Sequence, residues 1–367
     1  MSKILQLSVL DAVLHPRMYY KYALSFAEMG HQVKVIGEKK HNIFSPEKNI
    51  EILALPPIAP SAFARLRRQG HLWRIAWADK PDILMIHAIE LTFFAFLYKK
   101  IRPHTYVIYD VFEDYEKNLF YNPLLANWKK KMLKIILRPL ERFFAQYFDA
   151  VCYAENCYDN ILNIPDEKKY VFLNKFSPKI LKEPKKISLP AEPYMLYTGT
   201  LEENWGVLQT IEIWIGFNQI RPLHLVMAGF TYDSKMLAHI EQKVAESGLK
   251  HLFTLYGGNE YVSYADITYL IQNSQFGTGL YLPTPSIVGK IPTKFFEYMY
   301  LGKPLLFTSE PYWNELNERW KFGISVGENI SYSELLFQIN IYKPAIYKQE
   351  ASWENYKMAL TKLTNHV

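Results

Sequence analysis

The stretch Ile291-Pro-Thr-Lys-Phe-Phe-Glu-Tyr-Met-Tyr-Leu-Gly-Lys-Pro304 is the most informative part of the sequence. Pro292 stands just before a predicted helix, where its missing N–H is not needed, and Gly302 is a typical helix stop. The free amides of such a helix start form an anion site. Lys294 and Glu297 share one helix face, and they suit a phosphate and a ribose diol. An ordinary surface ion pair fits the same two residues.

Strands alternate with helices on both sides of this stretch. Nearly continuous apolar runs predict strands of a parallel sheet that is buried on both faces. In the first half these strands cover residues 4–9, 33–36, 82–86, 106–109, 150–153 and 170–173. In the second half they cover residues 194–197, 224–227, 254–256, 276–281 and 304–308.

The two alternations predict an α/β fold with two Rossmann-like domains that face each other across a cleft. We expect an N-terminal domain over residues 1–176 and a proline-rich linker over 177–193. The C-terminal domain is predicted over 194–345. Residues 346–367 are predicted to form a helix that packs back on the N-terminal domain.

Composition excludes several classes of protein. The chain has 367 residues, 49% of them hydrophobic, so it has material for a large core. Two cysteines make neither a disulfide scaffold nor a Cys-only zinc site. The apolar run over 83–98 is too short and too polar to span a bilayer, and no signal peptide is recognised. We therefore expect a cytoplasmic protein, and no nucleic-acid-binding signature is found.

Together, these segments resemble GT-B glycosyltransferases, in particular family 4-like bacterial enzymes of polysaccharide and glycolipid assembly. The stretch quoted above is similar to their donor-binding helix. Residues 149–155 resemble the strand that closes the first domain, and residues 197–207 resemble the turn that opens the donor domain. The next two strands, 223–229 and 253–258, follow in the same order. The resemblance covers most of the chain and implies the GT-B fold.

The resemblance implies that Glu297, the second glutamate of a Glu-x7-Glu motif, holds the nucleotide ribose. The chain departs from the pattern at Gly289, which replaces the first glutamate. It also departs at Thr200 and Trp205, which replace the arginine and lysine of the donor-domain turn. The donor-binding residues expected here are Glu297, Lys294, Lys290, Gly289, Thr293, Gly199, Thr200 and Arg17.

A second candidate site is Tyr109-Asp-Val-Phe-Glu-Asp-Tyr115, at the end of a predicted strand. The family often has a histidine where this chain has Phe112. Glu113 and Asp114 remain, and a carboxylate there can act as general base or bind a sugar hydroxyl. The alternative is that Asp110 and Asp114 cap the following turn.

The first loop, residues 8–17, contains no glycine, so side chains must supply its chemistry. Asp11 is a candidate base for an acceptor hydroxyl, or alternatively a helix N-cap. Arg17 can grip a phosphate. His15, together with His87 after another strand, completes the candidate acceptor site, although a lone histidine is more often structural.

The N-terminal half is also basic and aromatic. Residues 1–180 hold 26 of the 42 lysines and arginines, and basic residues alternate with aromatic and aliphatic ones over 62–77 and 127–147. Such stretches can lie on an anionic membrane, here the inner face of the cell membrane. A solvated helix face over a core stripe is the alternative.

We therefore expect transfer of a sugar from a nucleotide sugar to a glycan or lipid-linked acceptor, with retention, as the resemblance implies. No Asp-x-Asp triplet is present, so metal-independent transfer without a cofactor is expected. Two alternatives stay open: a noncatalytic GT-B partner of an active transferase, and a nucleotide-sugar epimerase.

Overall fold

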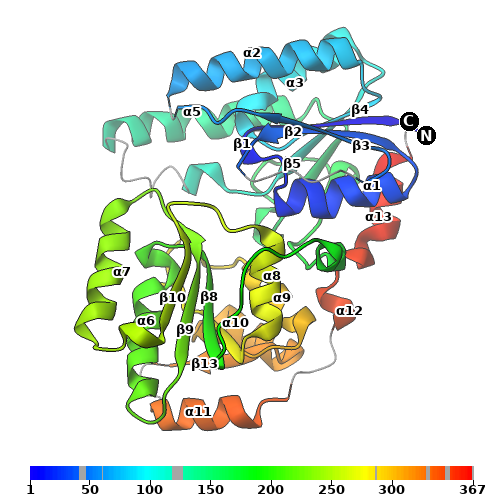
Figure 1. The fold of residues 1–367 in the computed structure, drawn as a ribbon. Helices are drawn as coiled ribbons and strands as arrows, with labels where there is room; N and C mark the ends of the chain where they lie inside the picture. Colours follow the sequence, from blue (N-terminus) through cyan, green and yellow to red (C-terminus); the bar gives the residue numbers. More distant parts are fainter. Residues whose placement is uncertain are drawn as a thin grey trace. The chain divides into compact units, whose positions relative to one another are not determined.

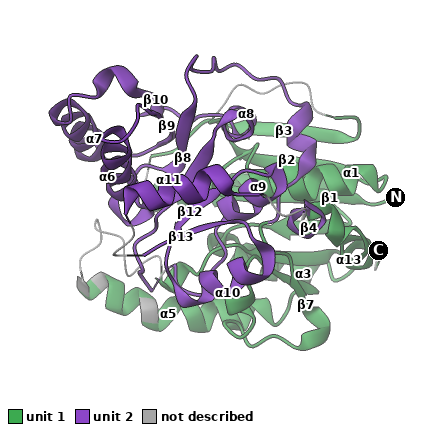
Figure 2. Cartoon of the chain, turned by 90° about the horizontal axis from the view of Figure 1, so that it is seen from below, with its two compact units in different colours: residues 1–174, 353–367 green, residues 175–352 purple. Residues whose placement is uncertain are grey.

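The computed structural model describes residues 1–40, 47–59, 61–117, 127–285, 287–327, 331–343 and 348–365, with the backbone alone at 127, 129 and 134. The chain forms two compact units, which Figure 2 colours separately. Unit 1 comprises Met1–Asn174 and Trp353–Val367, and unit 2 comprises Lys175–Ser352. The predicted linker, 177–193, thus belongs to unit 2, where the Lys186 and Ile187 amides donate to Asp266.

Unit 1 is built on a seven-stranded sheet in the order β3-β2-β1-β4-β5-β6-β7, with every strand pair parallel. The order reverses between β1 and β4, which makes a topological switch point there. The strands are β1 (Lys3–Ala12), β2 (Gln32–Glu38), β3 (Ile50–Leu55), β4 (Ile83–Ile86), β5 (Tyr106–Val111), β6 (Ala150–Tyr153) and β7 (Lys169–Val171).

Helices cover both faces of this sheet (Figure 1). One face carries α2 (Ala62–Asp79), α3 (Thr92–Ile101) and α5 (Asn127–Ala145). The other carries the π-helix η1 (Pro16–Ala23), α1 (Leu24–Glu28) and α13 (Lys357–Thr364). The returning segment is fixed by Trp353, whose indole donates to the Ser25 hydroxyl at 3.2 Å.

Unit 2 repeats the design with a six-stranded parallel sheet, β10-β9-β8-β11-β12-β13. Its switch point lies between β8 and β11. The strands are β8 (Tyr194–Thr200), β9 (His224–Phe230), β10 (Phe253–Gly258), β11 (Phe276–Gly279), β12 (Leu305–Thr308) and β13 (Gly323–Val326). One face packs against α6 (Val207–Asn218), α7 (Ser234–Glu246) and α11 (Tyr332–Ile341).

The opposite face of the unit 2 sheet carries α8 (Tyr264–Asn273) and α9 (Thr293–Leu301) (Figure 1). Next to α9 lies α10 (Pro311–Trp320), whose Trp313 ring packs 5.2 Å from Phe295. The remaining elements are short: η2 (Ile89–Leu91), η3 (Asn156–Tyr158), η4 (Asp166–Lys168), η5 (Pro178–Lys182), η6 (Glu203–Trp205), η7 (Lys250–Leu252), α12 (Lys348–Ala351) and η8 (Trp353–Tyr356).

The predicted fold class of two Rossmann-like parallel sheets is confirmed, and the predicted strands correspond to observed ones. Two strands were not predicted. β3 carries Glu51 and is only partly buried, so it lacks a continuous apolar run. β13 has four residues and begins at Gly323, which is too little for a pattern.

Candidate functional site

Lys294 lies at the unit 2 switch point, on the first turn of α9. Its ammonium donates to the Thr278 carbonyl at 3.1 Å. It also lies 4.3 Å from the ring centre of Tyr197 on β8 and 5.2 Å from that of Tyr281, just after β11. Gly199 is adjacent, since a Cβ there would lie 3.8 Å from Lys294 Cε. Two predicted donor-site residues are thus brought together.

The environment of Lys294 is unusual for a lysine. Its exposed fraction is 7%. Burial lowers the pKa of this ammonium to about 7, and nearby Glu297 only partly opposes the shift. The carbonyl and the two ring faces attract the cation. A bound anion would add a full opposite charge and raise the pKa again.

Glu297 lies one turn further along α9 and is 5% exposed. Besides Lys294, its charge acts on the Tyr281 and Tyr298 hydroxyls, whose pKa values are raised mainly by burial and then by this carboxylate. Lys294 and Glu297 are therefore not a surface ion pair, which was the alternative interpretation of this helix. Both belong to a buried polar site at the carboxyl ends of the strands.

The segment that leads into α9 supplies backbone groups. No side chain caps the helix start at Pro292, and Thr293 is half-buried as the first helical residue. Gly289 has a φ of 79°, which favours glycine. The Lys290 carbonyl accepts from the Trp313 indole at 2.8 Å, which holds this segment against α10. The start of α9 thus offers backbone amides and the half-buried Lys290 to an anion.

The turn after β8 also reaches this site. Gly206 has a φ of 81°, and a Cβ there would lie 2.0 Å from the Leu280 carbonyl oxygen, so only glycine fits. The turn holds the ring of Trp205 5.5 Å from that of Tyr281. Thr200 is exposed, and its carbonyl accepts from the Tyr197 hydroxyl. The glycosyltransferases that this turn resembles have an arginine and a lysine at positions 200 and 205. This chain has the hydroxyl of Thr200 and the indole of Trp205 there.

Arg17 occupies a different place from the one predicted. It is 1% exposed and forms a bidentate pair with Asp110 on β5, with N–O distances of 2.8 and 2.7 Å. Its other donors reach the Phe172 carbonyl, Asn174 and the Tyr22 hydroxyl. All five N–H groups are therefore used within unit 1. Arg17 has no donor left for a phosphate, so the predicted phosphate role is wrong.

His87 belongs to the same buried cluster. Its exposed fraction is 0%, and its ring nitrogens bond to Asp110 at 3.0 Å and to Gln6 at 2.9 Å. Although burial favours the neutral acid, Arg17 and His87 hold the pKa of Asp110 well below its usual range. Both ring nitrogens of His87 are thus engaged, and none is left for an acceptor. The structural interpretation of this histidine therefore holds.

Asp114 is also a structural residue. It is 3% exposed, it pairs with Arg138 of α5, and it accepts from the Lys117 amide at 3.4 Å. Arg138 further binds Glu141, which accepts from the Tyr109 hydroxyl at 2.8 Å. The turn-capping alternative for Asp114 is thus correct, and its predicted catalytic role is withdrawn because the carboxylate is buried and paired.

Three predicted residues stay accessible at the carboxyl ends of β1 and β5. Glu113 is exposed, while Asp11 and His15 are half-buried. Asp11 accepts from the Ser8 hydroxyl at 2.5 Å. His15 accepts from the Arg17 amide at 3.3 Å and so caps η1 in place of Asp11. Burial lowers the pKa of His15 to about 4 against the opposing charge of Asp11.

These three residues lie close to one another. The ring of Phe112 packs 5.7 Å from that of His15. Both Glu113 and Asp11 act on the Tyr115 hydroxyl, whose pKa is raised mainly by burial and then by these carboxylates. The structure thus assembles two carboxylates and a neutral imidazole around Phe112, at the edge of the sheet where a ligand of unit 1 would bind.

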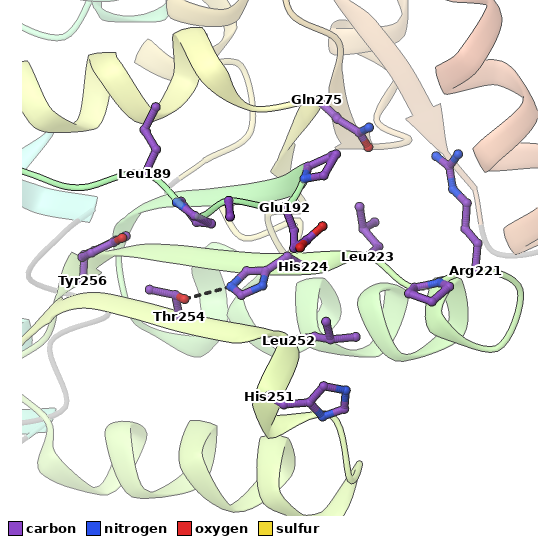
Figure 3. Close-up of a pocket in the computed structure, with 14 residues that line it drawn as sticks. Leu189, Glu192, Arg221, Leu223, His224, His251, Leu252, Thr254, Tyr256 and Gln275 are labelled. Atoms are coloured by element: carbon purple, nitrogen blue, oxygen red, sulfur yellow. Dashed lines mark hydrogen bonds between the residues drawn. The ribbon is translucent and has the colours of Figure 1, made fainter.

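Figure 3 shows a pocket at the opposite ends of the unit 2 strands. It has a volume of about 630 Å³ and includes His224, the first residue of β9, which bonds to Thr254 at 2.8 Å. Ligands of open α/β sheets bind at the carboxyl ends of strands, whereas this pocket is at the amino ends. We therefore assign no donor to it.

Sequence reasoning identified Lys294, Glu297 and Gly199 but not the two tyrosine rings, Tyr197 and Tyr281, that flank the lysine. Each tyrosine is the last residue of a predicted strand, 194–197 or 276–281, which was the available signal. Within the described residues, no three His, Cys, Asp or Glu side chains gather as a metal site would need. No helix in the same residues is long and apolar enough to cross a bilayer.

No protein-family model matches the chain, and no curated protein matches its sequence. Solved structures do match. A sucrose-phosphate synthase from Thermosynechococcus elongatus has a TM-score of 0.69 at 11% identity, covering 99% of this chain and 98% of its own. Anabaena HepE in complex with UDP-glucose has a TM-score of 0.63 at 13% identity, covering 100% of both chains. A trehalose-phosphate synthase from Burkholderia xenovorans has a TM-score of 0.61 at 9% identity, covering 99% and 98%. At these identities the likeness shows the fold, which is GT-B.

Proposed function

We propose that this protein transfers a sugar from a nucleotide-sugar donor to an acceptor hydroxyl. One observation carries the proposal: Lys294 is buried beside Glu297 at the unit 2 switch point, and its charge is only partly balanced there. A buried cation with an incomplete set of partners is a binding site for an anion. The resemblance of α9 to a donor-binding helix and the GT-B fold both support a nucleotide diphosphate as that anion.

The donor is proposed to lie over the start of α9. Lys294 and the backbone amides near Thr293 face the diphosphate, and Lys290 adds a second cation. Glu297 accepts hydrogen bonds from the ribose diol. Because one matching structure is HepE with UDP-glucose and another is named a UDP-forming synthase, a uridine diphosphate sugar is the first donor to test.

In the transfer, the acceptor oxygen bonds to the anomeric carbon while the bond from that carbon to the β-phosphate oxygen breaks. Lys294 and the helix amides stabilise the charge that develops on the leaving diphosphate. The acceptor proton passes to a base, for which Asp11 and Glu113 are the predicted candidates that stay accessible. Retention, cell-surface polysaccharide assembly and a glycan or lipid-linked acceptor rest on the family-4 resemblance alone.

The test is a calorimetric titration of the wild type with UDP, UDP-glucose and other nucleotide sugars, followed by a donor-consumption assay. We expect one donor to bind, and Glu297→Ala to weaken it at least tenfold, which is about 1.4 kcal/mol. Lys303→Ala is the matched control, because Lys303 lies just beyond α9 and donates to the Ser274 carbonyl. Equal loss in both variants would contradict the assignment.

Binding and turnover separate the proposal from its alternative. A noncatalytic partner would bind the nucleotide and never consume the donor, whatever acceptor is present. The departures at Gly289, Thr200 and Trp205 favour that alternative. No binding of any nucleotide by the folded protein would overturn the transfer proposal and leave a noncatalytic partner that holds a glycan.

A further inference from the structure

Helix α5 exposes a continuous apolar face, which we call the α5 stripe. Its members recur every three or four residues, so they share one side of the helix. Their exposed fractions run from 37% to 73%. The α5 stripe consists of Trp128, Met132, Ile135, Ile136, Leu140, Phe143 and Tyr147, the last just beyond the helix end.

The α5 stripe continues onto α3. The Phe96 ring lies 5.9 Å from that of Phe143 and 4.8 Å from that of Tyr147. Phe93, 48% exposed, packs 5.7 Å from Phe144. Scattered exposed apolar residues are common, but a contiguous patch across two helices marks an interaction surface.

Ion pairs on the inner side of α5 hold the stripe outward. Arg138 and Glu141 are 8% and 2% exposed and pair at 2.9 Å. Arg138 also binds Asp114, and Glu141 accepts from Tyr109 of the sheet. The helix therefore buries this ion pair beside the core residue Ala145 and leaves the stripe in solvent, whereas the exposed face of an ordinary surface helix is polar. Rotating α5 to bury its stripe would expose these pairs and break them.

The exposed charges beside the stripe are positive. Lys131 and Arg142 are exposed on one flank of α5, and the Lys100 ammonium of α3 lies 4.4 Å from the ring centre of Tyr147. The only carboxylate in the α5 sequence, Glu141, is buried and paired. Trp128 and Tyr147 stand at the two ends of the stripe, and such rings are favoured at the boundary between headgroups and acyl chains.

We propose that the α5 stripe inserts into the headgroup region of an anionic lipid bilayer, with α5 parallel to the membrane plane. The apolar side chains enter the acyl boundary, and the flanking cations meet lipid phosphates. The surface belongs to unit 1 alone and does not rest on sugar transfer. A second copy of the chain fits less well, because stripe-to-stripe packing would bring the same cations of both copies together.

The experiment is flotation of the full chain with phosphatidylcholine vesicles that contain about one third phosphatidylglycerol. We expect binding that weakens with salt and is at least tenfold weaker on pure phosphatidylcholine. The double variant Ile135→Asp/Phe143→Asp should lose binding at least tenfold. Phe337→Asp, on exposed α11 of unit 2, is the matched control and should bind like the wild type.

Charge is tested separately. Lys131→Glu/Arg142→Glu should reduce binding to anionic vesicles and remove most of its salt dependence, whereas Lys235→Glu on α7 should change neither. Circular dichroism and thermal unfolding establish that each variant is folded.

Equal vesicle binding by the wild type and Ile135→Asp/Phe143→Asp would overturn the proposal. So would a failure of the wild type to bind vesicles together with a concentration-dependent dimer that the double variant abolishes, since the stripe would then cover a second copy. Nucleotide titration of the same samples keeps this result apart from the donor-site proposal.

Discussion

Each unit buries a cation near the carboxyl ends of its strands, but the two cations have opposite surroundings. In unit 1, Arg17 meets a carboxylate, a carbonyl, an amide oxygen and a hydroxyl that together use all of its N–H groups. In unit 2, Lys294 meets a carbonyl and two aromatic rings. Burial lowers the pKa of Arg17, but Asp110 outweighs it and raises that pKa above its ordinary value. The pKa of Lys294 falls to about 7.

A structural charge and a ligand-binding charge differ in how completely the protein itself balances them. Sequence alone assigned both residues to one phosphate site, because both are cations near strand ends. A saturated ion pair has no capacity for a ligand, and removing one partner leaves a buried charge. A buried cation whose charge is only partly balanced binds an anionic ligand favourably. Replacing it costs the protein little of its free energy of unfolding.

Asp110→Asn should produce the largest effect. It leaves the Arg17 guanidinium buried beside a neutral group, so we expect a loss of about 3–5 kcal/mol in the free energy of unfolding. Urea denaturation measures it. The double variant Arg17→Met/Asp110→Leu should recover only part of the loss, because no unpaired charge remains but the Phe172 carbonyl and His87 lose their partners. A loss below about 1 kcal/mol in Asp110→Asn would break the comparison.

Asp114→Asn extends the contrast to a second paired cation of unit 1. We expect a smaller loss, about 1–3 kcal/mol, because Arg138 keeps Glu141 and Glu116 as partners. The neighbouring Glu113→Gln is the control: its carboxylate is exposed, so stability should change by less than about 0.5 kcal/mol. Thermal unfolding of the pair checks both values, and the reverse order would contradict the assignment of Asp114.

Lys294→Met should behave in the opposite way to Asp110→Asn. Replacing the buried ammonium removes its desolvation cost but leaves Glu297 without this cation, so we expect the free energy of unfolding to fall by no more than about 1 kcal/mol. Donor affinity should still fall about tenfold or more, which is about 1.4 kcal/mol. Calorimetry and urea denaturation on one sample separate the effects. A marked loss of stability with unchanged affinity would make Lys294 a structural residue like Arg17.

The pH dependence gives the smallest effect per step measured, at most about 1.4 kcal/mol for each pH unit. The pKa of Lys294 is about 7 in the folded chain against an ordinary value of 10.5. Between these values the unfolded chain holds a proton that the folded chain has lost, so this group makes stability rise with pH from about 7 to 10.5. Donor affinity should fall over the same range, because the anion favours the charged amine.

Since other groups also titrate, the quantity to measure is the difference between the wild type and Lys294→Met at each pH. The donor affinity of the wild type should fall by up to about tenfold for each pH unit above the pKa of Lys294. Identical pH profiles for the two proteins would show that this amine does not titrate on binding.

The fold was predictable from the sequence because apolar runs and glycine stops mark the parallel strands. Helix α9 was predictable because Pro292 and Gly302 mark its two ends, and the pairing of Lys294 with Glu297 follows from their spacing on it. The unit 1 cluster was not, because Arg17 and Asp110 are 93 residues apart. No local pattern shows that the Asp110 carboxylate will accept the hydrogen bonds of the Arg17 guanidinium. The Tyr197 and Tyr281 rings were missed for the same reason, since only the sheet brings them together.

The discontinuous composition of unit 1 bears on how the chain is made. Trp353 packs 5.2 Å from Tyr22 and donates to Ser25, yet it emerges from the ribosome only after residues 175–352. Synthesis at about 5–20 residues per second therefore leaves the packing site for Trp353 in the nascent unit 1 unfilled for roughly ten to forty seconds. Unit 2 is contiguous and folds without such a delay. The second unit in the sequence is thus the first to complete its core during biosynthesis.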